Sequence, residues 1–327
     1  MYRWTPCKGP SPEAVERMRA HFRKPRRPMG EAWFMGTERY LYTELSEKPL
    51  HEVSTETLCD CLWEIASGTG SFGHREEWDE WLRFLLPTLI SRSQETFAFD
   101  SVLEETITAS MVLFWDGLGG EYEGFRDDAL NSLGLCLMKE EMWGDCGRAP
   151  AQGSHPHNLF LLWEGEGGAL ELAAWDAGRA SEVMSASLFF CLKYLRAGEM
   201  PSWVESLAAI EDPCFRAALA VWLLGAYEIL KEAPVRPERI EKSNPRVTWH
   251  NSFLLGSSSK AESPTNDWRN FLPPENCAAF LRELRRTLTP EVLLSWAETF
   301  AADELLSGKM LNTADLLFDK LTEEGAA

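Results

Sequence analysis

The chain has 327 residues, of which 45% are hydrophobic and 25% are charged, which excludes a disordered or fibrous protein. Its 51 acidic residues outnumber 32 basic ones and give a net charge of −19. This charge argues against binding to nucleic acid or to an anionic membrane, because both attract clustered Lys and Arg.

The basic residues are concentrated at the start of the sequence. Residues 1–30 contain eight Lys or Arg and two Glu, a local charge of +6, which leaves −25 for the remainder. Apolar spacing predicts a helix over residues 12–24 of this basic arm. We expect the helix to dock on the acidic body, and a contact with nucleic acid or a membrane is the alternative.

Helical spacing of apolar residues recurs along the rest of the chain. Further helices are predicted over residues 55–67, 75–91, 101–115, 123–139, 180–197, 202–231 (with 213–231 as the clearest helix of this segment), 275–288, 290–306 and 312–323. Ser-x-x-Glu capping boxes begin at Ser101 and Ser202, and Asp212 before Pro213 marks a helix start. The two clearest buried stripes are Trp78, Trp81, Leu82, Leu85, Leu86 and Leu89, and Phe215, Ala218, Leu219, Trp222, Leu223, Ala226 and Leu230.

Strand signals are scarce. The best is the apolar run over residues 158–163, which is followed after a glycine-rich stretch by residues 169–175. This pattern predicts either a short hairpin or two helical turns.

The predicted helices follow one another in pairs. Pairs that begin at residues 55 and 101 are about 45 residues apart, near the period of HEAT-type repeats. We therefore expect an all-α protein, an irregular array of paired antiparallel helices that forms a HEAT-like solenoid or a helical bundle. The expected parts are a basic N-terminal arm and helix (1–30), a main helical domain (31–232), a long irregular loop (233–274) and C-terminal helices packed on the main domain (275–327).

The eight cysteines are scattered, and several, such as Cys136, Cys191 and Cys214, lie in apolar helical patterns. We expect reduced core thiols. A zinc site is not expected, because Cys59 and Cys61 form the one close pair and would point about 200° apart on a helix.

A cytoplasmic location is expected from two further features. No apolar run approaches the roughly 20 residues that span a bilayer. Residues 1–24 are rich in Arg and lack the apolar centre of a signal peptide.

Local catalytic motifs are weak. The glycine-rich stretch Gly68–Gly73 follows a predicted helix rather than a strand and is not followed by Lys-Ser or Lys-Thr, so we interpret it as an inter-helix turn. His155 and His157 have no obvious third ligand, and we expect neither a metal nor a cofactor. An enzyme with a site assembled around these histidines, with Glu164 or Glu166, remains an alternative.

An acidic segment offers the best candidate interface. Residues 121–145 contain seven acids and two basic residues, a local charge of −5. Such a field speeds the encounter with a basic partner, and Trp143 within it has the character of an interface anchor. The predicted partner-binding residues are Glu121, Glu123, Asp127, Asp128, Glu140, Glu141, Trp143 and Asp145.

These observations favour stoichiometric protein binding over catalysis. The hypothesis is an immunity or antitoxin-like protein of the cytoplasm that neutralises a basic, toxin-like partner. The alternatives are the motif-less enzyme and a scaffold subunit of a larger assembly, for which the basic arm would be a tether.

Overall fold

The computed structural model describes the greater part of the predicted helices. The described residues are 11–26, 32–34, 37–39, 42–68, 75–95, 107, 111, 118–133, 161–164, 170–173, 179–231, 272–303, 306–307, 310 and 312–322. Helices dominate these ranges, which confirms the all-α character, and two short hairpins add four strands.

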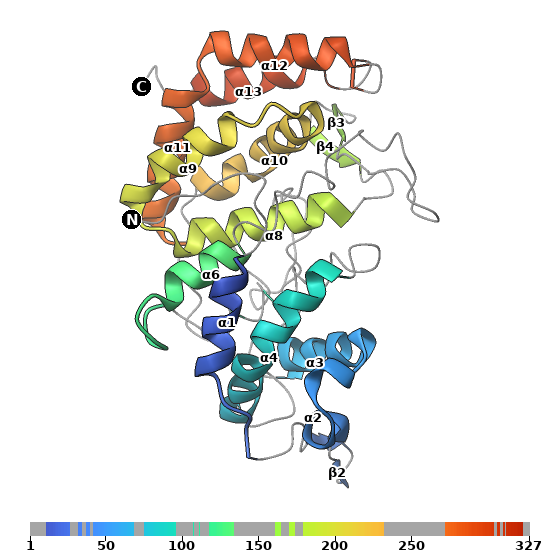
Figure 1. The fold of residues 1–327 in the computed structure, drawn as a ribbon. Coiled ribbons are helices and arrows are strands. Elements are labelled where there is room, and N and C mark those ends of the chain that lie inside the picture. Colours follow the sequence, from blue (N-terminus) through green and yellow to red (C-terminus); the bar gives the residue numbers. More distant parts are fainter. Residues whose placement is uncertain are drawn as a thin grey trace.

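A first group of helices occupies the lower half of Figure 1. It comprises α1 (Pro12–His21), α2 (Thr43–Glu47), the 3-10 helix η1 (Leu50–Glu52), α3 (Thr55–Gly68), α4 (Arg75–Glu95) and α6 (Phe125–Leu133). Helix α1 packs on α4 and α6, and α3 packs on α4. The prediction that the first helix docks on the body is confirmed.

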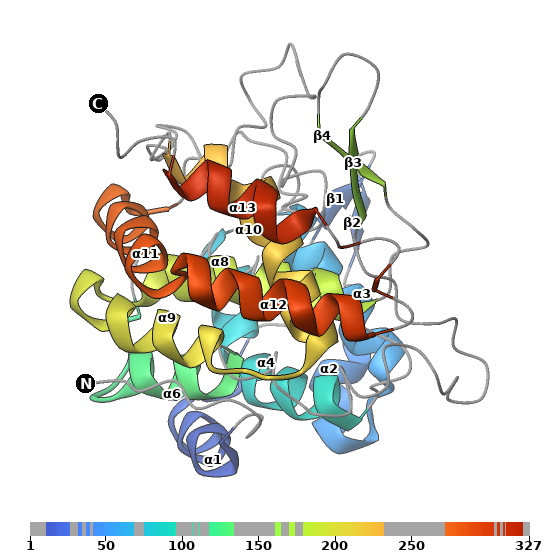
Figure 2. The same cartoon turned by 90° about the horizontal axis from the view of Figure 1, so that it is seen from above.

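A second group fills the upper half of Figure 1. It comprises α8 (Arg179–Tyr194), the 3-10 helix η4 (Ala197–Glu199), α9 (Met200–Ala208), α10 (Pro213–Lys231), α11 (Pro274–Thr287), α12 (Pro290–Ala302) and α13 (Thr313–Thr322). Helix α11 packs on α9, while α10 contacts α11, α12 and α13. In the view from above, α12 and α13 lie over α10 (Figure 2).

Two antiparallel hairpins complete the described structure. Strands β3 (Leu161–Glu164) and β4 (Leu170–Ala173) pair with Leu162 opposite Leu172, which confirms the hairpin interpretation of this segment over the helical one. Strands β1 (Ala32–Phe34) and β2 (Thr37–Arg39) form a hairpin that the sequence did not predict. Each of these strands has three residues, which is too short for the alternation of apolar and polar residues that indicates a strand.

The predicted stripes form the core. On α4, the side chains from Trp81 to Leu89 that lie on the stripe are fully buried, and all seven predicted residues of α10 are buried. The Trp222 ring meets Phe189 of α8 edge-on, with ring centroids 5.2 Å apart. Burying one such side chain contributes roughly 1.5–3 kcal/mol, so these stripes are what holds the helices together.

Helix starts agree with the sequence in one place and differ in another. Asp212 Oδ1 accepts a 2.8 Å hydrogen bond from the Phe215 N–H, which confirms the predicted cap of α10. The prediction of a capping box that begins at Ser202 is wrong. Helix α9 begins two residues earlier, at Met200, with Pro201 in its first turn. The Ser202 hydroxyl donates to the Glu199 carbonyl and does not cap the helix. The other predicted box lies outside the described residues.

Arg126 of α6 joins the two groups of helices. Its Nε donates to the Tyr194 carbonyl at 3.0 Å, and its Nη2 forms an ion pair with the buried carboxylate of Glu199. The same carboxylate accepts a 2.8 Å hydrogen bond from the Arg196 N–H. The end of α8 and the following turn are thereby fixed against α6.

Asn276 fixes the start of α11 against the end of α8. Its side-chain amide, buried at 4% exposure, donates to the carbonyls of Leu192 at 2.7 Å and Leu195 at 2.6 Å. Carbonyls in the last turn of a helix have no partner within the helix, so an amide from another helix satisfies them.

Candidate protein-binding interface

Asp128, which was predicted to bind a partner, is buried in the structure. It is 4% exposed, and Arg17 of α1 binds it with two hydrogen bonds, Nε to Oδ2 at 2.9 Å and Nη2 to Oδ1 at 2.6 Å. The Tyr122 hydroxyl donates to Oδ2 at 2.8 Å. Burial and this bond to a carboxylate both raise the pKa of Tyr122. Asp128 therefore attaches the basic first helix and is not available to a partner.

Glu121 is also engaged within the protein. Its carboxylate accepts a 2.6 Å hydrogen bond from Arg83 Nε of α4, and Arg83 also pairs with Asp79 one turn earlier. Burial would lower the pKa of the Arg83 guanidinium, but the hydrogen bonds to these two carboxylates outweigh it and raise the pKa. The pair ties the loop before α6 to α4, so the prediction that Glu121 faces a partner is not supported by its position.

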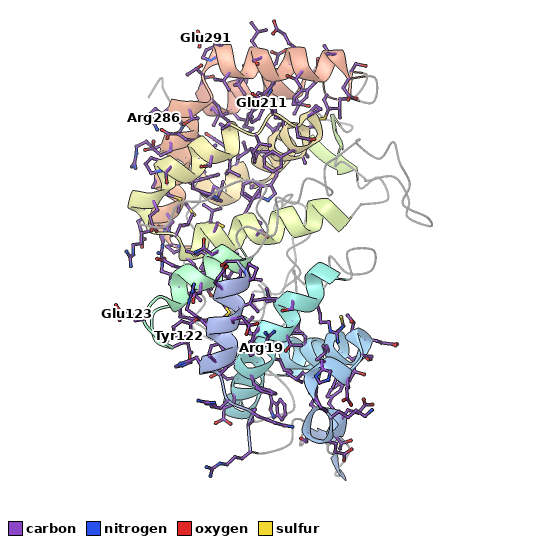
Figure 3. All side chains as sticks on the ribbon, viewed as in Figure 1. Arg19, Tyr122, Glu123, Glu211, Arg286 and Glu291 are labelled. Atoms are coloured by element: carbon purple, nitrogen blue, oxygen red, sulfur yellow. The ribbon has the colours of Figure 1, made fainter. Side chains whose placement is uncertain are left out.

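Two of the predicted residues are on the surface. Glu123 is exposed (Figure 3), and the Asp127 side chain is half-exposed while it accepts a 2.8 Å hydrogen bond from Arg126. The other predicted residues, together with the histidines of the enzyme alternative, lie outside the described residues; these are Glu140, Glu141, Trp143, Asp145, His155 and His157.

A different acidic surface lies on the outer face of α12. Leu294 is 62% exposed, the most exposed large hydrophobic residue of the described part of the chain. Glu291 and Glu298, both exposed, lie one turn before it and one turn after it on the same face. The opposite face contributes Trp296 to the core. Helix α12, at the top of Figure 1, thus presents to solvent an isolated leucine between two carboxylates.

Glu291 remains charged at neutral pH. Hydrogen bonds from the Thr289 hydroxyl and from its own backbone amide lower the pKa of its carboxyl group, and its position in the first turn of α12 favours a negative charge. Figure 3 shows Glu291 at the outer edge of the molecule. The sequence of α12 contains no Lys or Arg to offset it.

Helix α13 packs beside α12 and carries exposed acidic and apolar residues of its own. Phe318 is 37% exposed, and the exposed Asp315 and Asp319 lie within one turn of it. Lys320 is the one basic residue of α13, and its ammonium lies 5.8 Å from the centre of the Tyr227 ring. We define the α12–α13 outer surface as Glu291, Leu294, Glu298, Asp315, Phe318 and Asp319.

This surface was not predicted, because the density of charge along the sequence does not reveal it. The signal was present: at about 100° a residue, Leu294 lies about 200° around the helix from the large apolar residue Trp296 and one turn from Glu291 and Glu298. An apolar residue on the polar face of an amphipathic helix is a candidate contact residue.

Three further results bear on function. No group of three or more His, Cys, Asp or Glu among the described residues is placed to hold a metal ion. No helix in the described ranges is long and apolar enough to cross a membrane. No protein-family model, curated protein or solved structure matches the chain.

Proposed function

We propose that the chain is a cytoplasmic protein-binding module that neutralises a basic, toxin-like partner, in the manner of an immunity or antitoxin protein. The observation that carries the proposal is the exposed Leu294 between two carboxylates on α12. An apolar side chain between two negatively charged groups suits a partner that has an apolar patch within a positively charged surface.

Charge supports the same partner. The net charge of −19 repels acidic proteins and attracts basic ones over a distance of about 10 Å at ordinary ionic strength. Glu121 and Asp128 are neutralised internally by Arg83 and Arg17, so they contribute little to this attraction. Among the described residues, no Lys or Arg forms an ion pair with Glu291, Glu298, Asp315 or Asp319 of the α12–α13 outer surface.

The helical array provides the support for such an interface. We also propose that the helices form an irregular two-helix repeat. Two pairs of consecutive helices support this: α3 packs on α4, and α12 packs on α13. A rigid outer helix presents its side chains in a fixed geometry, which lowers the entropy lost on binding.

The experiment begins with the partner. Basic proteins of the source organism that the immobilised chain retains at low salt are identified, purified and assayed for toxicity with and without the chain. The proposal expects a basic toxic protein whose activity is lost at a 1:1 ratio. A retained protein whose activity is unchanged by saturating amounts of the chain would contradict neutralisation.

Variants then locate the interface. Reversal of charge in Glu291→Lys with Glu298→Lys should slow association and reduce its salt dependence, because rim charges steer the encounter. The matched control is Glu56→Lys with Asp60→Lys, two exposed acids one turn apart on α3. A larger effect from the control pair would place the interface on the first group of helices instead.

A further inference from the structure

A pocket of about 670 Å³ lies between α1, η1 and α4, far along the molecule from the α12–α13 outer surface. This volume is within the range of small-molecule sites, roughly 300–1,000 Å³. Its lining combines an apolar wall with hydroxyl groups and basic side chains. These three features determine which class of ligand the pocket can bind.

The apolar wall comes from Phe22, Leu50, Phe84 and Pro87. The ring of Phe22 is held edge-on by Phe125, at a centroid distance of 5.6 Å, and Phe84 lies edge-on to a buried ring of α4. Edge-on packing restricts both rings, so the wall is formed before any ligand arrives. A flat aromatic group gains ring contacts with this wall without first ordering it.

Thr88 of α4 supplies a hydroxyl group beside this wall. Among the described residues, the Thr88 hydroxyl has no hydrogen-bond partner, whereas the hydroxyl of Ser91, one turn later, donates to the Pro87 carbonyl at 2.9 Å. A threonine hydroxyl has one donor and two acceptor lone pairs, so it can bond either a hydroxyl or a carbonyl group of a ligand. Thr88 therefore provides a polar contact that can orient a mostly apolar ligand.

The basic side chains of the lining determine the charge of the ligand. Arg19 forms an ion pair with Glu16, and Arg92 Nη2 donates to the His51 carbonyl at 2.9 Å. Because both guanidinium groups already have partners within the protein, an anionic ligand would have to displace them. The positive charges repel a cation, and no carboxylate among the described residues lines the pocket to attract one. A neutral ligand meets neither obstacle.

We propose that this pocket binds a neutral aromatic molecule of two or more rings, with its rings against Phe22 and Phe84 and a hydroxyl or carbonyl group hydrogen-bonded to Thr88. Aromatic rings pack edge-on or offset against one another, and such pairs are stronger than the buried area alone predicts. The hydrogen bond sets the orientation of the ligand, because the wall beside it is apolar. This binding is independent of the proposed partner surface, since the lining comes from α1, η1 and α4.

The test measures the binding of 2-naphthol to the full chain at pH 7 by calorimetry, beside naphthalene, 2-naphthoate and 2-naphthylmethylammonium. These probes share one ring system and differ in the group attached to it. 2-Naphthol should bind saturably at 1:1, about fivefold more tightly than naphthalene, as expected for one neutral hydrogen bond, and more tightly than either charged probe. Thr88→Val keeps the shape of the side chain and removes the hydroxyl, so it should weaken the binding of 2-naphthol about fivefold and leave that of naphthalene unchanged.

Two further variants place the binding in this pocket. Thr88→Trp fills the pocket and should abolish the binding of 2-naphthol. The matched control is Thr299→Val, the same change at a partly buried threonine of α12, which should leave the affinities unchanged. If Thr88→Trp does not fold, as judged by circular dichroism, Thr88→Val decides, because it is isosteric and the Thr88 hydroxyl has no hydrogen bond to lose among the described residues.

Three outcomes would overturn the proposal. The first is no saturable binding of 2-naphthol to the unaltered chain. The second is that Thr88→Val weakens 2-naphthol no more than naphthalene, or no more than Thr299→Val does, which would mean that the Thr88 hydroxyl bonds no ligand. The third is binding of 2-naphthoate that is tighter than that of 2-naphthol, which would mean that the basic side chains and not the wall select the ligand.

Discussion

Replacement of Asn276 by alanine removes the amide that joins α11 to the end of α8. Two hydrogen bonds, of 2.7 and 2.6 Å to the carbonyls of Leu192 and Leu195, are lost. Each contributes about 1 kcal/mol, and leaving the two buried carbonyls without a donor costs about 1 kcal/mol more. The expected loss of unfolding free energy is therefore about 3 kcal/mol, with a melting temperature lower by about 4 °C.

The measurement is urea denaturation of both proteins followed by circular dichroism at 222 nm. Asn276→Asp is the informative second variant, because it keeps the shape of the side chain and removes both N–H donors; it should lose at least as much stability. Glu275→Gln, an exposed change in the same turn, is the control and should stay within about 0.5 kcal/mol. If the alanine variant also stays within that margin, the amide does not hold the two helices together.

Three other predictions concern acid stability, thiol reactivity and binding. Hydrogen bonds from Arg286 and Arg282 lower the pKa of Glu283 below its ordinary 4.5. The charged carboxylate therefore stabilises the fold above pH 4.5, and this contribution is lost as the pH falls through the lowered pKa of the folded state. The variant Glu283→Gln should reduce the difference in stability between pH 7 and pH 3, and the control Glu123→Gln should not. In peptide-level labelling at pH 8 without reductant, the half-buried Cys59 should react before Cys277, whose pKa burial raises to about 12, and intact mass should show no disulfide. Leu294→Ala should speed dissociation of a bound partner by about tenfold or more while leaving the fold intact, since Leu294 is 62% exposed; an unchanged dissociation rate would remove it from the interface.

Periodicity predicted most of the helices because burial repeats along each of them. Every described side chain of the α4 and α10 stripes is buried, and α10 begins and ends at the predicted residues. The start of α9 was misplaced because two signals compete there. Pro201 suits the first helical turn, and this preference outweighs the Ser202 box.

The burial of Asp128 also follows from this periodicity, although it was not predicted. Asp128 lies three residues after Phe125 and one before Ala129, on the stripe that α6 buries. A carboxylate on a buried stripe requires a cationic partner, so its burial was predictable. The identity of that partner was not, because Arg17 lies 111 residues away and no local pattern connects the two positions.

The placement of Arg17 and Asp128 changes how the charge of the chain should be understood. The basic arm was expected to dock on the acidic body, whereas the acidic segment over residues 121–145 was expected to face a cationic partner. In the structure they meet, and Arg17 neutralises Asp128 while Arg83 neutralises Glu121. Charge density along the sequence is therefore a poor guide to the field outside the protein. Under the proposed function, the carboxylates that attract a partner are those on faces without basic residues, and among the described helices α12 is such an element.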